Sequence, residues 1–170
     1  MIALIGTHGV GKTTLLNSLA LRGSNYIVKD GDSRIVKAFD KEIGGKLTAR
    51  DQQILINRIS DNKWDLETRI SNLFTTRTPL DHYAYCKALG WDDLAERRNN
   101  LFTSTPRPDV KFFYIPIEFG LISDGIRFEG ESFQREIDEI LLERIDYHGL
   151  SPITLTGTVE ERLETLLKNI

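Results

Sequence analysis

The sequence has little cysteine and proline and no long apolar run. Its single cysteine, Cys86, excludes an internal disulfide, which fits a reducing compartment. We interpret Cys86 as structural, because no neighbouring residue suggests a paired catalytic base. No apolar run reaches the ~18 residues of a membrane span. The first predicted strand begins at Met1, leaving no room for a signal or transit peptide, so a cytosolic protein without a membrane anchor is expected.

The sequence also lacks an excess of positive charge, with a formal net charge of -3. This balance excludes a basic protein that coats nucleic acid along its whole length. The charge is uneven, since residues 1–111 carry 17 Lys or Arg against 13 Asp or Glu, and residues 112–170 carry 5 against 12. A polyanionic partner would therefore meet the first part more readily.

Apolar strand-like runs alternate with amphipathic helical patterns along residues 1–170, which we interpret as one domain. The predicted strands cover residues 1–6, 25–30, 69–76, 110–117 and 152–157. The predicted helices cover about 12–21, 33–43, 48–62, 92–101 and 133–145, with one more helix starting at 78 and a last helix after 158. Three helix starts carry capping-box pairs, namely Thr48 with Asp51, Thr78 with Asp81, and Thr158 with Glu161. This alternation predicts an α/β fold with a doubly wound, five-stranded parallel sheet and ligands at the carboxyl ends of the strands.

A phosphate-binding loop (P-loop) of the pattern G-x-x-x-x-G-K-T follows the first strand. Its two fixed glycines let the backbone approach phosphate oxygens, and its successive amides face them. Lys12 is expected at the β- and γ-phosphates, and the Thr13 hydroxyl on Mg²⁺. His8 stands at a variable position, where we expect an exposed side chain without a role of its own. The predicted phosphate-binding residues are Gly6, Thr7, His8, Gly9, Val10, Gly11, Lys12 and Thr13.

The stretch 62–65 reads N-K-W-D, which matches the guanine-reading N-K-x-D of GTPases. In those proteins it follows a buried strand, whereas here Ile56 and Ile59 before it have the spacing of a helix face. No D-x-x-G lies between it and the P-loop. We therefore interpret the stretch as the end of a helix, with Trp64 anchoring the turn to the next strand.

Two further loops are candidates for a second substrate and for catalysis. Asp30 and Asp32 follow the second strand, where either can act as a base or simply make a turn and a helix cap. Arg77 follows the third strand and would point into the cleft to bind an acceptor phosphate.

For the remaining candidates, one of the two interpretations, functional or structural, is favoured over the other. We interpret Asp81 mainly as a cap. Arg127, oriented by Asp124, lies in a glycine-rich stretch that suits a lid over residues 118–131, closing an arginine over the transferring phosphoryl group. Arg97 and Arg98 are expected on a solvated helix face.

Three stretches carry a family resemblance: IGTHGVGKTTLL, TRTPLDHYAY, and DGIRFEGESFQREIDEILLERIDYHGLSPITLTGTVEERLETL. In these the chain resembles the ribosylnicotinamide-kinase-like group of P-loop ATPases and kinases, which are often phage-encoded. The resemblance implies a nucleoside-monophosphate-kinase-like fold with a short lid, ATP with Mg²⁺, and phosphorylation of a nucleoside-like acceptor. It places ATP among Gly6, Gly11, Lys12, Thr13 and Thr14, the adenine near Gly157 and Thr158, and Arg127 in the lid.

One departure from that group matters. It usually has Asp-Arg where this chain has Thr76-Arg77, so a carboxylate must come from elsewhere, with Asp30, Asp32 and Asp81 as candidates. Two other functions stay open. One is a kinase acting on 5-hydroxymethyluracil in DNA, and the other is a nucleotide-binding regulator or ATPase module that transfers nothing. The sequence carries no signal for an oligomeric state.

Overall fold

The centre of the fold is a parallel sheet. The structure, a computed structural model, describes residues 1–22, 27–29, 33–42, 44–107, 109–120 and 130–170. Five strands pair in the order β2-β3-β1-β4-β5, and every neighbouring pair is parallel. The strands are β1 (Ile2–Ile5), β2 (Ile27–Lys29), β3 (Leu73–Thr75), β4 (Lys111–Tyr114) and β5 (Ile153–Thr154). The predicted five-stranded parallel sheet is thus confirmed, although the strands are shorter than the apolar runs.

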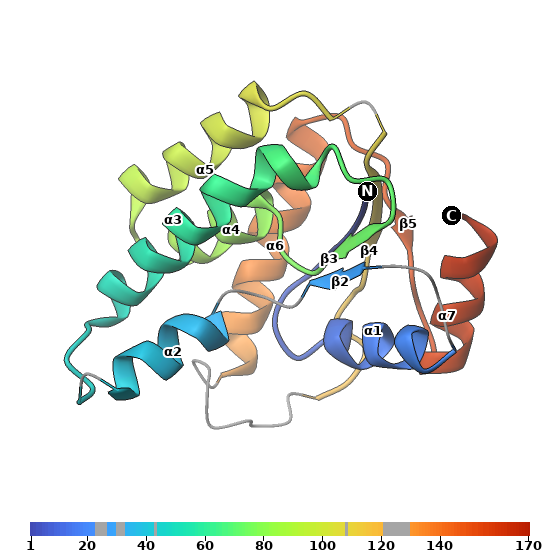
Figure 1. Ribbon diagram of the computed structural model, residues 1–170, viewed down its shortest axis with the longest axis horizontal. Helices are drawn as coiled ribbons and strands as arrows, with labels where there is room; N and C mark the ends of the chain where they lie inside the picture. The colour runs from blue at the N-terminus through green and yellow to red at the C-terminus, as the bar shows by residue number, and fades with distance from the viewer. Residues whose placement is uncertain (23–26, 30–32, 43, 108, 121–129) are drawn as a thin grey trace.

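Helices cover both faces of the sheet (Figure 1). They are α1 (Lys12–Leu21), α2 (Ser33–Glu42), α3 (Ala49–Glu67), α4 (Pro79–Ala88), α5 (Asp92–Ser104), α6 (Glu131–Tyr147) and α7 (Val159–Lys168). Among these helices of the described residues, none combines the length and the apolar character needed to cross a membrane.

The two faces follow from the alternation of side chains along β1. Ala3 and Ile5 pack into a core with apolar residues of α3, α4, α5 and α6. Ile2 and Leu4 pack into a second core with α1 and α7. Residues of β1 are buried on both sides, which explains why its sequence is apolar throughout rather than alternating.

The three predicted capping boxes are present, at Thr48, Thr78 and Thr158. The N-K-W-D stretch lies inside α3, as the helical interpretation requires, but the helix runs on to Glu67 instead of ending near residue 62. Trp64 therefore sits within the helix. It is fully buried and stacks on Phe102 of α5, with ring centroids 6.2 Å apart. Burial of this large ring against α5 favours continuation of the helix through a locally polar stretch.

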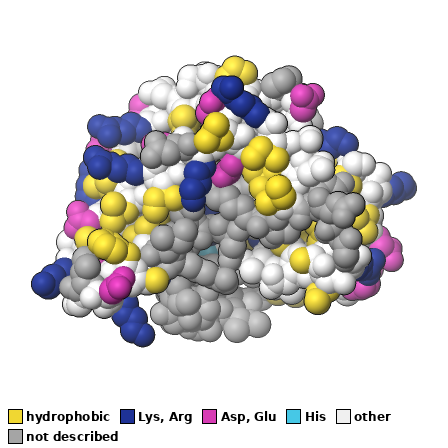
Figure 2. Space-filling view, viewed as in Figure 1, with side chains coloured by type: hydrophobic (Ala, Val, Ile, Leu, Met, Phe, Trp, Pro, Cys, Tyr) yellow, Lys and Arg dark blue, Asp and Glu magenta, His cyan; other side chains and the backbone are white. Residues whose placement is uncertain are grey.

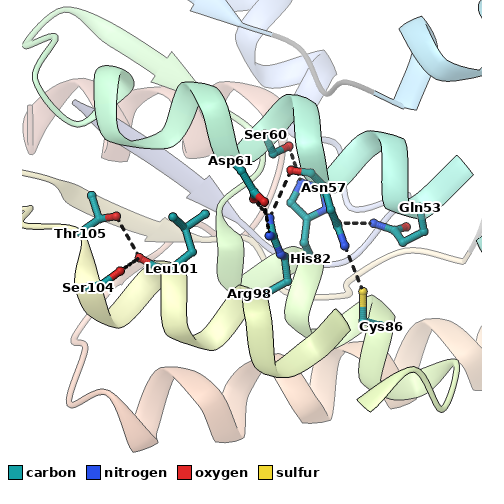
Figure 3. Close-up of polar contacts among 10 residues, drawn as sticks. All are labelled: Gln53, Asn57, Ser60, Asp61, His82, Cys86, Arg98, Leu101, Ser104 and Thr105. Atoms are coloured by element: carbon teal, nitrogen blue, oxygen red, sulfur yellow. Dashed lines mark hydrogen bonds and ion pairs between the residues drawn. The ribbon is translucent and has the colours of Figure 1, made fainter. Parts of the chain in front are cut away.

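The prediction that Arg97 and Arg98 lie on a solvated helix face is right for Arg97, which is exposed, and wrong for Arg98, which is buried. The Arg98 side chain is only 4% exposed and forms an ion pair with Asp61 of α3 through two nitrogens. A third hydrogen bond runs from Arg98 to the carbonyl of Asn57, 3.3 Å away. Figure 3 shows Arg98 reaching from α5 toward α3. The spacing of Leu94, Ala95, Arg98 and Phe102 explains the burial, because all four lie on the face of α5 that packs inward.

Cys86 lies in the same polar cluster between α3, α4 and α5. The Asn57 side-chain amide donates to its sulfur at 3.7 Å and accepts from Gln53 at 2.9 Å. Burial raises the pKa of the Cys86 thiol to about 11. A buried thiol that stays protonated is a poor nucleophile, which agrees with the structural interpretation.

Candidate active site

The P-loop joins β1 to α1 at the carboxyl edge of the sheet, and its glycines are required by geometry. Gly6 has φ 143°, and a Cβ there would lie 2.6 Å from the Ile115 carbonyl oxygen. Gly11, the N-cap of α1, has φ 93° in the left-handed region. The two fixed glycines of the motif are thus explained: Gly6 by the close approach of the Ile115 backbone, and Gly11 by its left-handed conformation.

Replacing Gly6 by alanine is expected to destabilise the fold by about 2 kcal/mol, because a backbone carbonyl cannot give way as a flexible side chain would. Gly90→Ala is the matched control: Gly90 has φ 69°, but a Cβ at this position would meet no atom within 4 Å. It should cost about 1 kcal/mol from backbone strain alone. Urea unfolding of both variants measures the difference, and equal losses would contradict the steric account of Gly6.

Lys12, the first residue of α1, places its ammonium group across the loop. Its Nζ donates to the Gly6 and Thr7 carbonyls at 2.5 Å each, and the side chain is buried. The positive charge is thus held inside the ring of loop backbone, together with the N-terminus of α1. This concentration of positive field suits an anion such as a phosphate. Thr13 and Thr14 follow in the first turn, with Thr13 half-buried and Thr14 exposed.

Asp81 connects α4 to the P-loop. Its Oδ2 accepts from the amide and hydroxyl of Thr78, both at 2.8 Å, and its Oδ1 accepts from the Gly6 amide at 3.2 Å. The carboxylate is buried, and both of its oxygens are engaged. This geometry favours the structural role considered for Asp81, extended by a contact with the P-loop that the capping pattern does not reveal.

His8 corrects the expectation of an exposed loop residue, since it is fully buried. Its Nδ1 lies 2.7 Å from the Tyr85 hydroxyl and 3.2 Å from the Thr7 hydroxyl. Its carbonyl accepts from the Gln134 side chain of α6 at 2.7 Å. The imidazole also contacts the Phe133 ring, with centroids 6.4 Å apart. His8 is therefore the point where α4 and α6 both meet the P-loop.

Arg77 stands between β3 and α4 and is half-buried. Its guanidinium carbon lies 4.9 Å from the centroid of the Tyr85 ring, within cation–π range. Because Tyr85 also contacts His8, both Arg77 and the P-loop lie against the same tyrosine side chain. Asp30, Asp32, Asp124 and Arg127, the other predicted catalytic or lid residues, lie outside the described residues.

Asp138 of α6 was missed by the sequence reasoning. Its Oδ2 accepts a hydrogen bond from the Tyr114 hydroxyl at 2.7 Å, and its Oδ1 is buried without a hydrogen-bond partner among the described residues. Burial raises the pKa of Asp138, opposed by the Tyr114 hydrogen bond and by the charge of Lys12. The pKa of Tyr114 is also raised, by burial and then by the neighbouring carboxylate. Tyr114 pairs in register with Ile5, the residue before Gly6.

Arg162 of α7 was likewise missed and fastens the loop from the other face of the sheet. Its guanidinium donates to the Val10 carbonyl at 2.7 Å and pairs with Glu118, whose carboxylate accepts from the Gly157 amide at 2.9 Å. The turn before α7, with Gly157 and the capping residue Thr158, is thereby tied to the P-loop. A signal was present in the sequence, because Arg162 falls on the apolar stripe of α7 beside Leu163 and Leu166.

Comparisons with known proteins agree with this architecture. A family model described as AAA domain matches residues 1–162. No curated protein sequence is significantly similar to the chain.

Three solved structures illustrate the likeness in fold. Deoxyadenosine kinase from M. mycoides, with dCMP and dCDP bound, has a TM-score of 0.70 at 14% identity, covering 98% of this chain and 96% of that one. Thymidylate kinase from Candida albicans has a TM-score of 0.62 at 18% identity, covering 98% and 88%. The NadR protein in complex with NR has a TM-score of 0.69 at 17% identity. The match covers 98% of this chain and 50% of the NadR chain.

Proposed function

The chain belongs to the AAA domain family, and from that premise we propose that it is an ATP-dependent kinase whose phosphoryl acceptor is a nucleoside or nucleotide. The observation that carries the proposal is the P-loop with the Lys12 ammonium held across it. The likeness in fold to nucleoside and nucleotide kinases supports the choice of reaction.

On the donor side, the loop amides and Lys12 bind the phosphates of ATP. Lys12 acts as a point charge at the β- and γ-phosphates, where negative charge is concentrated during transfer. The contact of Arg162 with Val10 and Glu118 supports an adenine position near Gly157 and Thr158, because it fixes that turn beside the loop.

The residues also fit a hydrated Mg²⁺ ion. Thr13 offers a hydroxyl directly after Lys12, and Asp138, within electrostatic reach of Lys12, has a buried carboxylate oxygen with no partner among the described residues. Mg²⁺ typically binds few protein ligands and takes the rest from water and substrate phosphates. Such a site needs no cluster of three metal-binding side chains, and the described residues contain none. When bound, the ion would neutralise phosphate charge.

On the acceptor side, the substrate hydroxyl oxygen bonds to the γ-phosphorus while the bond to the β–γ bridging oxygen breaks and ADP leaves. The hydroxyl proton passes to a carboxylate, for which we propose Asp30 or Asp32. Arg77 is proposed to bind an acceptor phosphate. Arg127 is proposed to close over the transferring group from a lid spanning residues 118–131.

A small acceptor is favoured over DNA by the surface charge. On the one face of the molecule that Figure 2 shows, the Lys and Arg side chains of the described residues are interspersed with Asp and Glu. A DNA acceptor needs several cationic groups aligned along the backbone phosphates. We therefore propose a free nucleoside or nucleotide, with modified DNA as the alternative to be tested.

The test presents γ-labelled ATP to the protein with a panel of nucleosides and nucleotides, and separately with DNA containing 5-hydroxymethyluracil. Label is expected in a small molecule, and ATP turnover is expected to require that acceptor. Label entering DNA alone would contradict the proposed acceptor and keep the kinase. ATP hydrolysis that is equally fast with and without an acceptor would instead indicate an ATPase module.

A further inference from the structure

The Asp138 carboxylate is incompletely satisfied. Its Oδ2 accepts from the Tyr114 hydroxyl at 2.7 Å, whereas its Oδ1 is buried and has no hydrogen-bond partner among the described residues. A buried carboxylate oxygen without a partner is costly, and proteins rarely keep one unless a ligand, ion or water completes it. The free oxygen therefore points to a group that binds there.

Asp138 also lies where that group would meet the P-loop. Tyr114 ends β4 and pairs with Ile5 of β1, so its backbone lies beside the residue that precedes the loop. Gln134, one helical turn before Asp138, donates to the carbonyl of His8 in the loop. Lys12 is close enough to interact electrostatically with Asp138. The N-terminal half of α6 thus faces the loop at both positions.

No other described acid near the P-loop offers a free oxygen in this way. Both oxygens of Asp81 are engaged, by Gly6 and by Thr78. The residues that end and follow β3 are Thr75 and Thr76, neither of which can supply a negative charge. A carboxylate for an ion bound with the nucleotide therefore has to come from another element, and α6 offers one.

We propose that Asp138 is the carboxylate that holds the hydrated Mg²⁺ ion accompanying the nucleotide, with Tyr114 as the residue that orients it. This inference rests on the proposed ATP binding. The chemistry agrees with the arrangement, because Mg²⁺ is commonly held by one or two carboxylates together with phosphates and waters. A hydrogen-bonded partner that fixes such a carboxylate is a recurring feature of metal sites.

The test measures ATP binding by calorimetry in excess Mg²⁺ and in EDTA. In Asp138→Asn, the gain in ATP affinity that Mg²⁺ gives should fall by about 10–100-fold. ATP affinity in EDTA should stay within about threefold. Asparagine keeps an oxygen acceptor for the Tyr114 hydroxyl, so the melting temperature should not fall. Tyr114→Phe keeps the charge but frees the carboxylate, and should lose part of the same gain.

Asp146→Asn is the matched control, since Asp146 lies on the same helix with an exposed side chain. It should keep the full Mg²⁺ gain. If the wild-type protein binds ATP with a Mg²⁺ gain that Asp138→Asn retains, the role of Asp138 is overturned while the kinase proposal stands. If the wild-type protein binds no ATP under either condition, both proposals are overturned.

Discussion

Replacing Lys12 with alanine is expected to lower kcat for phosphoryl transfer by at least ~10²–10³-fold, the loss typical when one preorganised group that stabilises transition-state charge is removed. Among the described residues, Arg162 is a second cation at the loop, but its contacts leave it unable to replace Lys12. The Lys12 ammonium is held by two loop carbonyls, and Arg162, which also touches the loop, donates to Val10 from the other face and is committed to Glu118. The measurement is the initial rate with the best acceptor found in the panel.

Two controls separate chemistry from folding. Lys168→Ala removes the same group from an exposed position on α7 and should keep the parental rate. The melting temperature of Lys12→Ala should stay close to that of the parent, because the two carbonyls it releases can bind water. A Lys12→Ala protein that is folded and transfers phosphate at the parental rate would contradict the proposed kinase site.

Asp61→Asn is expected to lower the free energy of unfolding by about 3 kcal/mol, because it leaves the Arg98 guanidinium buried without its counter-charge. The Arg98 side chain is only 4% exposed, while that of Asp61 is 34% exposed, which places the expected loss at the lower end for a broken buried pair. For a chain of this length the melting temperature should fall by about 6–12 °C. Burial already lowers the pKa of Arg98 to about 10.

Asp65→Asn is the matched control on the same helix. Asp65 pairs with Arg69 at 2.7 Å, but both side chains are largely exposed. Such a pair is worth about 0–1 kcal/mol, so its loss should be small. Combining Asp61→Asn with Arg98→Met should recover much of the stability, because no buried charge then remains. Equal losses for Asp61→Asn and Asp65→Asn would show that the Arg98 pair adds nothing beyond a surface contact.

The features that the sequence predicted well are local ones. The P-loop spacing, the three capping boxes and the helical character of the N-K-W-D stretch each depend on residues a few positions apart. The order of the strands could not be predicted in this way. Alternating strands and helices predict a parallel sheet but do not tell which strand pairs with which. The end of α3 was misjudged because a contact between Trp64 and Phe102 cannot be seen in a short window.

The residues whose burial or contacts the sequence did not predict are charged or polar groups with partners distant in sequence. His8 is buried by residues of α4 and α6, which are 77 and 126 positions away. Arg98 and Arg162 occur on helices whose other buried positions are apolar. Asp138 lies on α6, where Ile137, Leu141 and Ile145 are buried together with the polar Gln134. A charged residue on an apolar stripe is a usable signal, because it is buried only with a partner. The sequence marks the residue in this way, but only the fold identifies the partner.

The P-loop backbone is fastened by three different helices: Asp81 of α4 holds the Gly6 amide, Gln134 of α6 holds the His8 carbonyl, and Arg162 of α7 holds the Val10 carbonyl. These tethers come from both faces of the sheet, so the loop loses its conformational entropy when the protein folds rather than when a ligand arrives. A phosphate entering the loop meets amides that are already oriented, and its binding energy is not spent on ordering them. If the proposed function holds, differences in substrate preference would reside in other segments of the chain, because the phosphate-binding loop is fixed before the ligand binds.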